Sequence, residues 1–224
     1  MRGPGRILIP LLAALLIAGL AGCGSGGDST SGEGSAKTSS GAGKDGSEEP
    51  APETVDKPAK LPDGWTTSVN KNGGFSIGLP PGWSSRATEG GQGSIVTAPD
   101  DLITLTITAD RTSGALALPL DEFATRTAEA LGSDVVGDDR FDDLFVTKSA
   151  PFKLGHGYEA AAVRASGRSA RTGVKEMIFV VVVRRPDQAA YVVISRENAQ
   201  QQSKVASRDD VKEIIRSLRG RPVG

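Results

Sequence analysis

Residues 174–183 read Val-Lys-Glu-Met-Ile-Phe-Val-Val-Val-Val, and this stretch decides the fold of the chain. A β-strand turns successive side chains to opposite faces of its sheet, so the unbroken valine run places apolar side chains on both faces. Such a strand belongs in the centre of a sheet that is covered on each side. After a turn at residues 184–187, residues 190–195 return as a second central strand. The two stretches predict an apolar hairpin at the heart of the domain.

Other strands are shorter or half-buried. Residues 102–109 alternate between aliphatic side chains and threonines, which predicts a strand with one buried face. Pro80, Pro81 and Gly82 form a turn signal that ends one short strand and places Trp83. The strand that ends at this turn lies within residues 73–79, and others are expected at residues 94–98 and 158–165. Residues 141–152 are expected to contain one or two more strands.

Two helices interrupt and end this series of strands. Residues 120–131 carry apolar side chains at helical spacing, with Pro119 at the start and Gly132 at the end. The last helix is expected to begin at Ser207, with Asp210 as its capping partner. Its apolar face consists of Val211, Ile214, Ile215 and Leu218. Its stop signals are Gly220 and Pro222. This order predicts the α+β class, as an α/β/α sandwich with a mostly antiparallel sheet and helices on both faces.

The N-terminus has the plan of an export signal. Two arginines precede an apolar run of 14 residues, from Ile7 to Leu20, which is shorter than the ~18 residues of a membrane-spanning helix. The run ends in Leu20-Ala21-Gly22-Cys23, and Cys23 is the only cysteine of the chain. These four residues resemble the lipobox of bacterial prolipoproteins.

The resemblance implies that residues 1–22 are removed and that the Cys23 thiol receives a diacylglyceryl group. The protein would then be held on the outer, extracytoplasmic face of the cell membrane. The alternative is an ordinary secretory signal that happens to contain a cysteine. With Cys23 acylated, no thiol remains, so the exported domain depends on its own core rather than on disulfides.

Residues 23–60 are expected to form a tether between this anchor and the domain. They consist mainly of Gly, Ser, Thr, Ala, Pro and charged residues, a composition that cannot bury enough apolar surface to fold. As a flexible coil, the 37 residues after Cys23 would span on the order of 35 Å. Residues 61–224 are long enough for one domain with a core of its own.

The charge of this domain is balanced but unevenly distributed. Residues 61–224 contain 20 basic and 20 acidic residues, which argues against a nucleic-acid partner. Residues 144–185 contain eight basic residues and two acidic ones. Four cations flank the loop of the expected hairpin and form a candidate binding patch: Arg164, Arg168, Arg171 and Lys175. Its partner could be an anionic lipid headgroup, an anionic wall polymer or an acidic envelope protein; the plainer reading is a soluble hairpin with charged ends.

No residues form a recognisable catalytic or metal site in this sequence. His156 is the only histidine, and its glycine neighbours favour a turn rather than a catalytic role. Zinc needs clustered Cys and His, and no nucleophile elbow is present, so we expect neither enzymatic activity nor a cofactor. The acidic group Asp138, Asp139, Asp142 and Asp143 lacks the spacing of a calcium loop.

A carrier of an apolar small molecule or lipid is the alternative function. Four alanines in or next to a central strand leave room for a ligand beneath a helix: Ala160, Ala161, Ala162 and Ala165. Alanine-rich strands also allow a helix to pack closely, and then no space remains.

Several segments together resemble PsbP-like proteins, and in particular the LpqN-type lipoproteins of actinobacteria. They are residues 75–83 (Phe-Ser-Ile-Gly-Leu-Pro-Pro-Gly-Trp), residues 120–124, the apolar hairpin and residues 214–219. The resemblance implies an antiparallel sheet between helices and a non-enzymatic accessory or binding role. The family shares no catalytic residues, so none is assigned here. We expect a membrane-anchored binding module for an envelope protein or another envelope component.

Replacing Cys23 tests the expected anchor. The Cys23→Ala variant has no thiol to acylate, so labelling with radioactive palmitate should disappear and the leader should no longer be cut by the lipoprotein-specific peptidase. Metabolic labelling and the mass of the mature N-terminus measure both effects. Unchanged labelling and unchanged membrane fractionation would contradict the lipoprotein assignment.

Overall fold

The computed structural model of the protein describes residues 57, 59–154, 157–185, 189–199 and 208–221. The expected signal peptide, residues 1–22, lies outside these ranges, as does nearly all of the expected tether at residues 23–60. Within the described ranges, no helix is long and apolar enough to cross a membrane.

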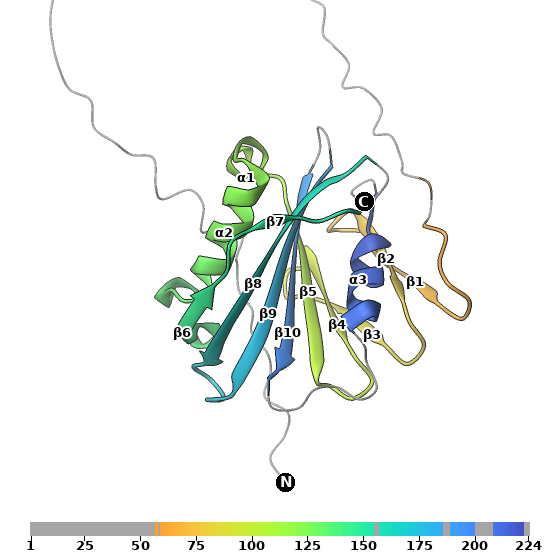
Figure 1. The fold of residues 1–224 in the computed structure, drawn as a ribbon. Helices are drawn as coiled ribbons and strands as arrows, with labels where there is room; N and C mark the ends of the chain where they lie inside the picture. The colour runs from red at the N-terminus through yellow and green to blue at the C-terminus, as the bar shows by residue number, and fades with distance from the viewer. Residues whose placement is uncertain (1–56, 58, 155–156, 186–188, 200–207, 222–224) are drawn as a thin grey trace, which may run out of the picture.

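An eight-stranded antiparallel sheet forms the centre of the fold (Figure 1). Its strand order is β3-β4-β5-β10-β9-β8-β6, and β7 pairs with β8 outside this path. The strands are β3 (Ser84–Ala87), β4 (Gly93–Thr97), β5 (Ile103–Asp110), β6 (Phe141–Val146), β7 (Ala150–Pro151), β8 (Glu159–Ser169), β9 (Lys175–Arg185) and β10 (Ala189–Asn198). The two strands predicted to be central are therefore neighbours in the middle of the sheet.

Strand β9 contributes to a separate core on each face of this sheet. Val181 and Val183 belong to one core, whereas Ile178, Val180 and Val182 belong to the other. All four valines are fully buried, at 0% exposure. The expected cover on both faces of the sheet is confirmed, and so is the α+β class.

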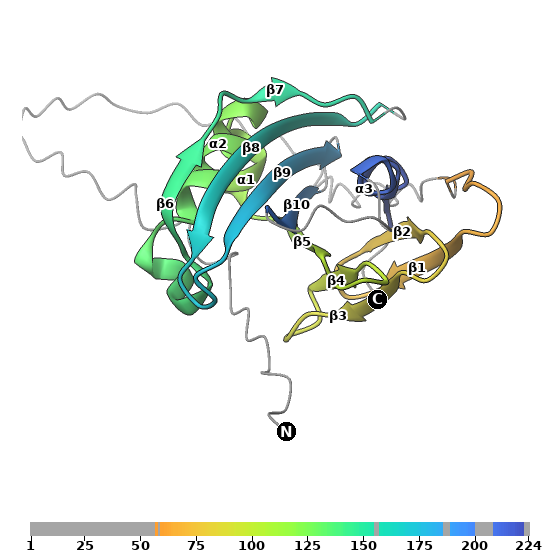
Figure 2. The same ribbon diagram turned by 60° about the horizontal axis from the view of Figure 1, so that its bottom comes forward.

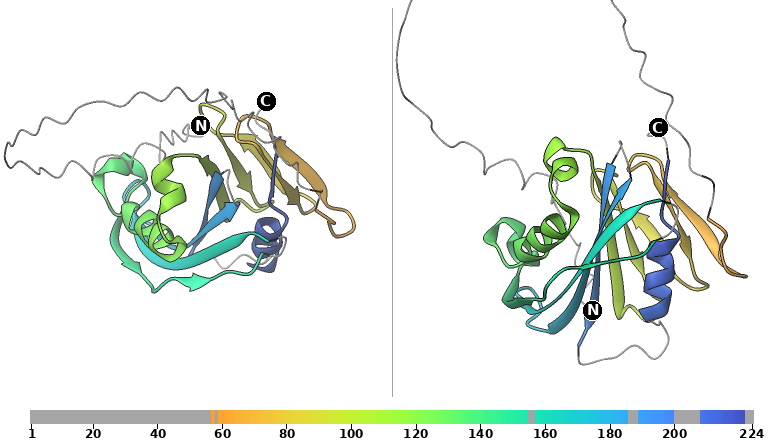
Figure 3. Two further views of the ribbon diagram at one scale, coloured as in Figure 1. Left: turned by 90° about the horizontal axis from the view of Figure 1, so that it is seen from above. Right: turned by 45° about the horizontal axis from the view of Figure 1, so that its top comes forward.

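Helices α1 (Ser113–Ala117) and α2 (Leu120–Ala130) cover one face, and α3 (Arg208–Arg216) lies on the other (Figure 3). Phe123, Ala124 and Ala128 of α2 pack in the same core as Ala161 and Ala165 of β8. Alanine side chains on both sides bring this helix close to the sheet, so the space that a carrier would need here is filled. A short 3₁₀ helix, η2 (Asp134–Asp139), follows α2.

A second sheet was not expected from the sequence. It has the order β1-β2-β11 and consists of β1 (Thr66–Asn70), β2 (Phe75–Leu79) and β11 (Arg219–Gly220). Gly220, expected to stop the last helix, instead pairs with Phe75 after α3 has ended at Arg216. The burial of Leu218 in the core and a hydrogen bond from the Gly220 N–H to the Tyr158 hydroxyl (2.9 Å) hold the chain extended there.

Buried polar side chains join this small sheet to the rest of the domain. The Ser217 hydroxyl accepts a hydrogen bond from the Gly78 N–H of β2 (2.7 Å) and donates one to the Ile214 carbonyl of α3 (2.6 Å). The Asn70 amide donates to the Gly93 carbonyl of β4 at 2.6 Å. The bond from Gly78 satisfies a buried backbone N–H of β2, and the other two add a second donor to carbonyls that already accept a backbone hydrogen bond.

The expected turn before Trp83 is also present. The Trp83 N–H donates to the Pro80 carbonyl (3.2 Å), and Gly82 has a φ of 80°, which a residue with a Cβ adopts only with strain. The turn places Trp83 at the edge of the core that α3 covers.

The Ser217 bridge generates a stability prediction. Ser217→Ala leaves the buried Gly78 N–H without an acceptor, so the free energy of unfolding should fall by about 1–3 kcal/mol. Urea denaturation followed by circular dichroism measures this change. Ser84→Ala, at an exposed position of β3, is the control and should stay within about 0.5 kcal/mol of the parent protein. Equal effects of the two variants would show that the bridge contributes nothing.

Candidate binding surface

The hairpin of β8 and β9 extends beyond the elements that cover it on the α3 side (Figure 2). Along β9, the side chains on this side become more exposed toward the hairpin loop: Val181 is buried, Phe179 is partly buried, and Met177 and Lys175 are exposed. Helix α3 packs near the buried end of the strand, in the core that contains Val181. The loop end of this face is therefore accessible to a partner.

Five exposed cationic or apolar side chains share this accessible face with Ser166 and the carboxylate Asp142. Arg168 pairs with Lys175 across the hairpin, and Ser166 pairs with both Met177 of β9 and Phe145 of β6. Directly opposite residues in an antiparallel pair lie on the same face, and alternate residues along β8 add Arg164 to this set. Phe145 is 66% exposed and Met177 is 37% exposed, which is unusual for apolar side chains of this size. We call this set the distal patch: Phe145, Arg164, Arg168, Lys175 and Met177.

The cations of the distal patch are not neutralised by described residues. Within the described part of the chain, no carboxylate forms an ion pair with Arg164, Arg168 or Lys175. Arg168 donates instead to the Gly173 carbonyl of the hairpin loop (2.7 Å). The patch thus combines three positive charges with two exposed apolar side chains.

Asp142 is the carboxylate opposite Arg168 in the register, and it contacts a different arginine. Arg140 donates to Asp142 at 3.2 Å and to Asp134 at 2.8 Å. The hydrogen bond and charge of Asp142, with the charge of Asp134 beside it, raise the pKa of Arg140 above its ordinary value. Arg140 therefore remains charged and contacts both carboxylates with its single positive charge.

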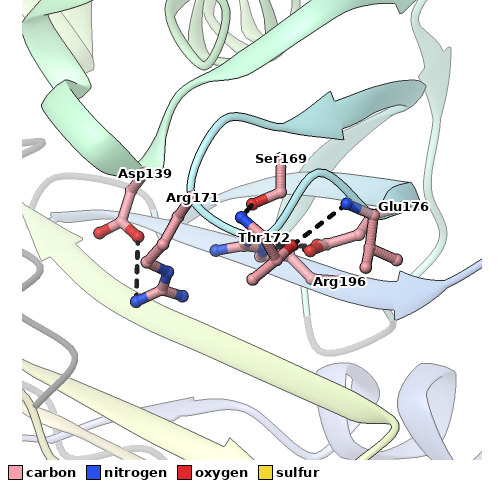
Figure 4. A network of polar contacts seen from close by, with 7 residues as sticks. Asp139, Ser169, Arg171, Thr172, Glu176 and Arg196 are labelled. Atoms are coloured by element: carbon pink, nitrogen blue, oxygen red, sulfur yellow. Dashed lines mark hydrogen bonds and ion pairs between the residues drawn. The ribbon is translucent and has the colours of Figure 1, made fainter. Parts of the chain in front are cut away.

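Arg171, the fourth member of the patch expected from sequence, lies apart from the other three. Its guanidinium is 3.6 Å from the Asp139 carboxylate of η2 (Figure 4). It lines a hollow on the opposite face of the sheet, together with Thr104 and Thr106 of β5. Arg171 thus belongs to the side of the sheet that carries α1 and α2.

Phe145 was not among the binding residues expected from the sequence, and a β-bulge explains why. Phe141 and Phe145 are four residues apart in one strand, a spacing that would normally place them on the same face. The register between β6 and β8 shifts between Asp142 and Phe145, and Asp143 has a φ of 51° there. As a result Phe141 is 2% exposed whereas Phe145 is 66% exposed. The sequence gives no clear signal of the inserted residue.

A small apolar hollow lies next to the distal patch, between α3 and β9. Its volume is about 130 Å³, and Phe179, Val211, Arg208 and Lys212 are among its lining residues, with Arg164 and Met177 of the patch. Pockets that enclose a small-molecule ligand usually measure about 300–1,000 Å³, so this hollow is too small to enclose a lipid. A wider depression beside β7, of about 680 Å³, is largely open to solvent.

The other candidate residues form no site in the described structure. His156 lies outside the described residues. Asp138 and Asp139 belong to η2, and Asp142 and Asp143 to β6, where Arg140 and Arg171 contact members of the group. Throughout the described ranges, no three His, Cys, Asp or Glu side chains lie close enough together to hold a metal ion.

Comparison with known proteins gives similar folds but no family. A scan against protein-family models and a search of curated proteins each found no match for this chain. Among solved structures, the PsbP protein of the cyanobacterium Synechocystis (CyanoP) is similar over 74% of this chain and 97% of its own length, with 10% identity and a TM-score of 0.49. LpqN of Mycobacterium tuberculosis, described as involved in cell envelope biogenesis, is similar over 71% of this chain and 87% of its own length, with 13% identity and a TM-score of 0.42.

A protein from Bacteroides thetaiotaomicron matches 69% of this chain with 14% identity and a TM-score of 0.45, and this chain spans about half of its length (48%). PsbP-like folds are thus among the structural neighbours, as the sequence resemblance implied. At these identities the likeness concerns the α+β fold and carries no function, and the LpqN-type assignment stays a prediction.

The alternation of exposed and buried side chains at the loop end of β9 can be tested by two neighbouring substitutions. Met177→Ala should lower the free energy of unfolding by no more than about 1 kcal/mol, because Met177 lies in the accessible patch. Ile178→Ala should lower it by about 2–5 kcal/mol, because Ile178 is buried against the opposite core. Urea denaturation of both variants measures the difference. A loss at residue 177 as large as that at residue 178 would mean that the patch is covered in the folded protein.

Proposed function

We propose that this protein is a membrane-anchored, extracytoplasmic binding module without catalytic activity. A diacylglyceryl group on Cys23 attaches it to the outer face of the cell membrane. The distal patch is its contact surface for a negatively charged component of the envelope: an anionic lipid headgroup, an acidic protein or an anionic polymer. The role is accessory: the module holds or positions another component.

The observation that carries this proposal is the placement of three cations without carboxylate partners on one accessible sheet face. Uncompensated positive charges attract an anionic partner over several ångströms and guide its approach. Phe145 and Met177 add apolar surface that a partner can cover, which lowers the dissociation rate once contact is made.

The position of the patch also suits a tethered module. The first described residues lie next to β2. The Leu61 side chain is so close to Gly78 that a Cβ added to Gly78 would lie 2.4 Å from it. Figures 1 and 2 show this segment beside the three-stranded sheet, whereas the loop end of β8 and β9 lies on the other side of the domain. The attachment segment therefore leaves the patch uncovered and free to meet a partner.

The carrier function has less support. Ala161 and Ala165 are covered by α2, and the hollow beside α3 is small. A binding surface therefore accounts for more of the described features than an internal ligand site does.

Charge reversal in the patch tests the proposed contact surface. The chain from Gly24 onward, which cannot be lipidated, should bind isolated cell envelopes at low ionic strength, and Arg164→Glu/Arg168→Glu should weaken this binding by roughly tenfold or more. Lys71→Glu/Arg86→Glu, at exposed positions elsewhere, changes the net charge equally and is the matched control. Co-sedimentation at low and high salt measures the binding. If the two double variants bind alike, the patch is not the contact surface.

A further inference from the structure

We propose that the distal patch docks onto a bilayer that contains anionic lipids, so that the domain lies on a membrane surface. This inference rests on the proposed function, in which the patch is a contact surface, and it names the chemistry of the contact.

The arrangement of the three cations suits a surface of distributed charge better than a single anionic group. Arg168 and Lys175 are direct neighbours across the hairpin, whereas Arg164 is four residues from Arg168 along β8. Four residues in a strand span about 13 Å, so the three charges do not converge on one point. An anionic bilayer offers many headgroups at such spacings, and each cation can meet a different one.

The apolar members of the patch favour a bilayer over a hydrated polymer as the partner. Phe145 and Met177 are both opposite Ser166, so they flank β8 in the same row of the sheet, beside Arg164 and Arg168. An anionic polymer in water would compensate the charges but would offer these side chains no apolar medium. At a membrane surface, cations meet the headgroups while aromatic and aliphatic side chains enter the boundary of the acyl region.

The predicted tether is long enough for this orientation. The patch and the segment that leads to the tether lie on different sides of the domain, so the domain must turn for the patch to reach the anchoring membrane (Figure 2). The 37 residues between Cys23 and the domain could extend over more than ~100 Å. Anchoring at Cys23 would also keep the local concentration of lipid high, so that a weak contact suffices.

Vesicle binding tests the inference directly. The probe is the chain from Gly24 onward, which lacks the lipid and retains every residue of both cores. It should sediment with vesicles of phosphatidylglycerol and phosphatidylcholine, and not with vesicles of phosphatidylcholine alone. A Lys or Arg near such a surface contributes about fivefold in affinity, so Arg164→Glu/Arg168→Glu should reduce binding at least ~25-fold. Arg164→Lys/Arg168→Lys keeps both charges and should bind like the parent chain.

The apolar contact has its own readout. Phe145→Ser should reduce binding to anionic vesicles by about fivefold or more, because it removes the largest exposed apolar side chain of the patch. In Phe145→Trp, the fluorescence of the new tryptophan should shift to shorter wavelength on mixing with anionic vesicles, compared with the parent chain that contains only Trp65 and Trp83.

Three results would overturn the inference: no preference for anionic over neutral vesicles, equal binding by the two arginine double variants, or no spectral shift in Phe145→Trp. If vesicle binding fails while envelope binding still depends on Arg164 and Arg168, the patch recognises an acidic protein or polymer. The proposed function would then stand and the lipid contact would not.

Discussion

Strand β9 has apolar side chains on both faces, and each face must be shielded from water for the strand to be stable. One face is met by α3 and by β2 of the small sheet, and the other by α1 and α2. Removing the cover on either face would expose fully buried valines to water and lower the stability of the domain by several kcal/mol. The two layers therefore depend on one another through this strand. The distal patch exists because β9 continues past the end of its cover on one side only.

The opposite ends of β9 therefore have different tasks. Near Val181 the strand is packed with the density of a protein interior, and substitutions there affect folding. Near Lys175 the side chains on the α3 side are exposed to solvent, and under the proposed function substitutions there should change binding and not folding. Contacts on the other face hold this loop end in place. Arg196 forms an ion pair with Glu176 at 2.8 Å (Figure 4). Its guanidinium also lies 4.7 Å from the centre of the Phe141 ring. The distal patch is therefore accessible to solvent, while these contacts fix the strand end that carries it.

Much of the fold could be predicted because its signals are local. The threonine alternation of β5, the helical spacing of α2 and the valine run of β9 each follow from one segment alone. The second sheet could not be predicted, because β11 has only two residues and β1 carries few large apolar side chains.

The residues of the candidate site were harder to predict than the fold. Arg164, Arg168 and Lys175 were found by charge, but the Asp139 contact that separates Arg171 from them depends on how η2 packs. The exposure of Phe145 depends on a bulge that shifts the register by a residue.

The pairing of β2 with β11 joins residues 75 and 76 to residues 219 and 220, almost at the two ends of the folded domain. This contact joins segments that are far apart in the sequence, so the loop-closure entropy that opposes it is large for a strand of only two residues. Strand β11 therefore relies on its surroundings: Leu218 in the core and the Tyr158 hydroxyl hold residues 218–220 beside β2.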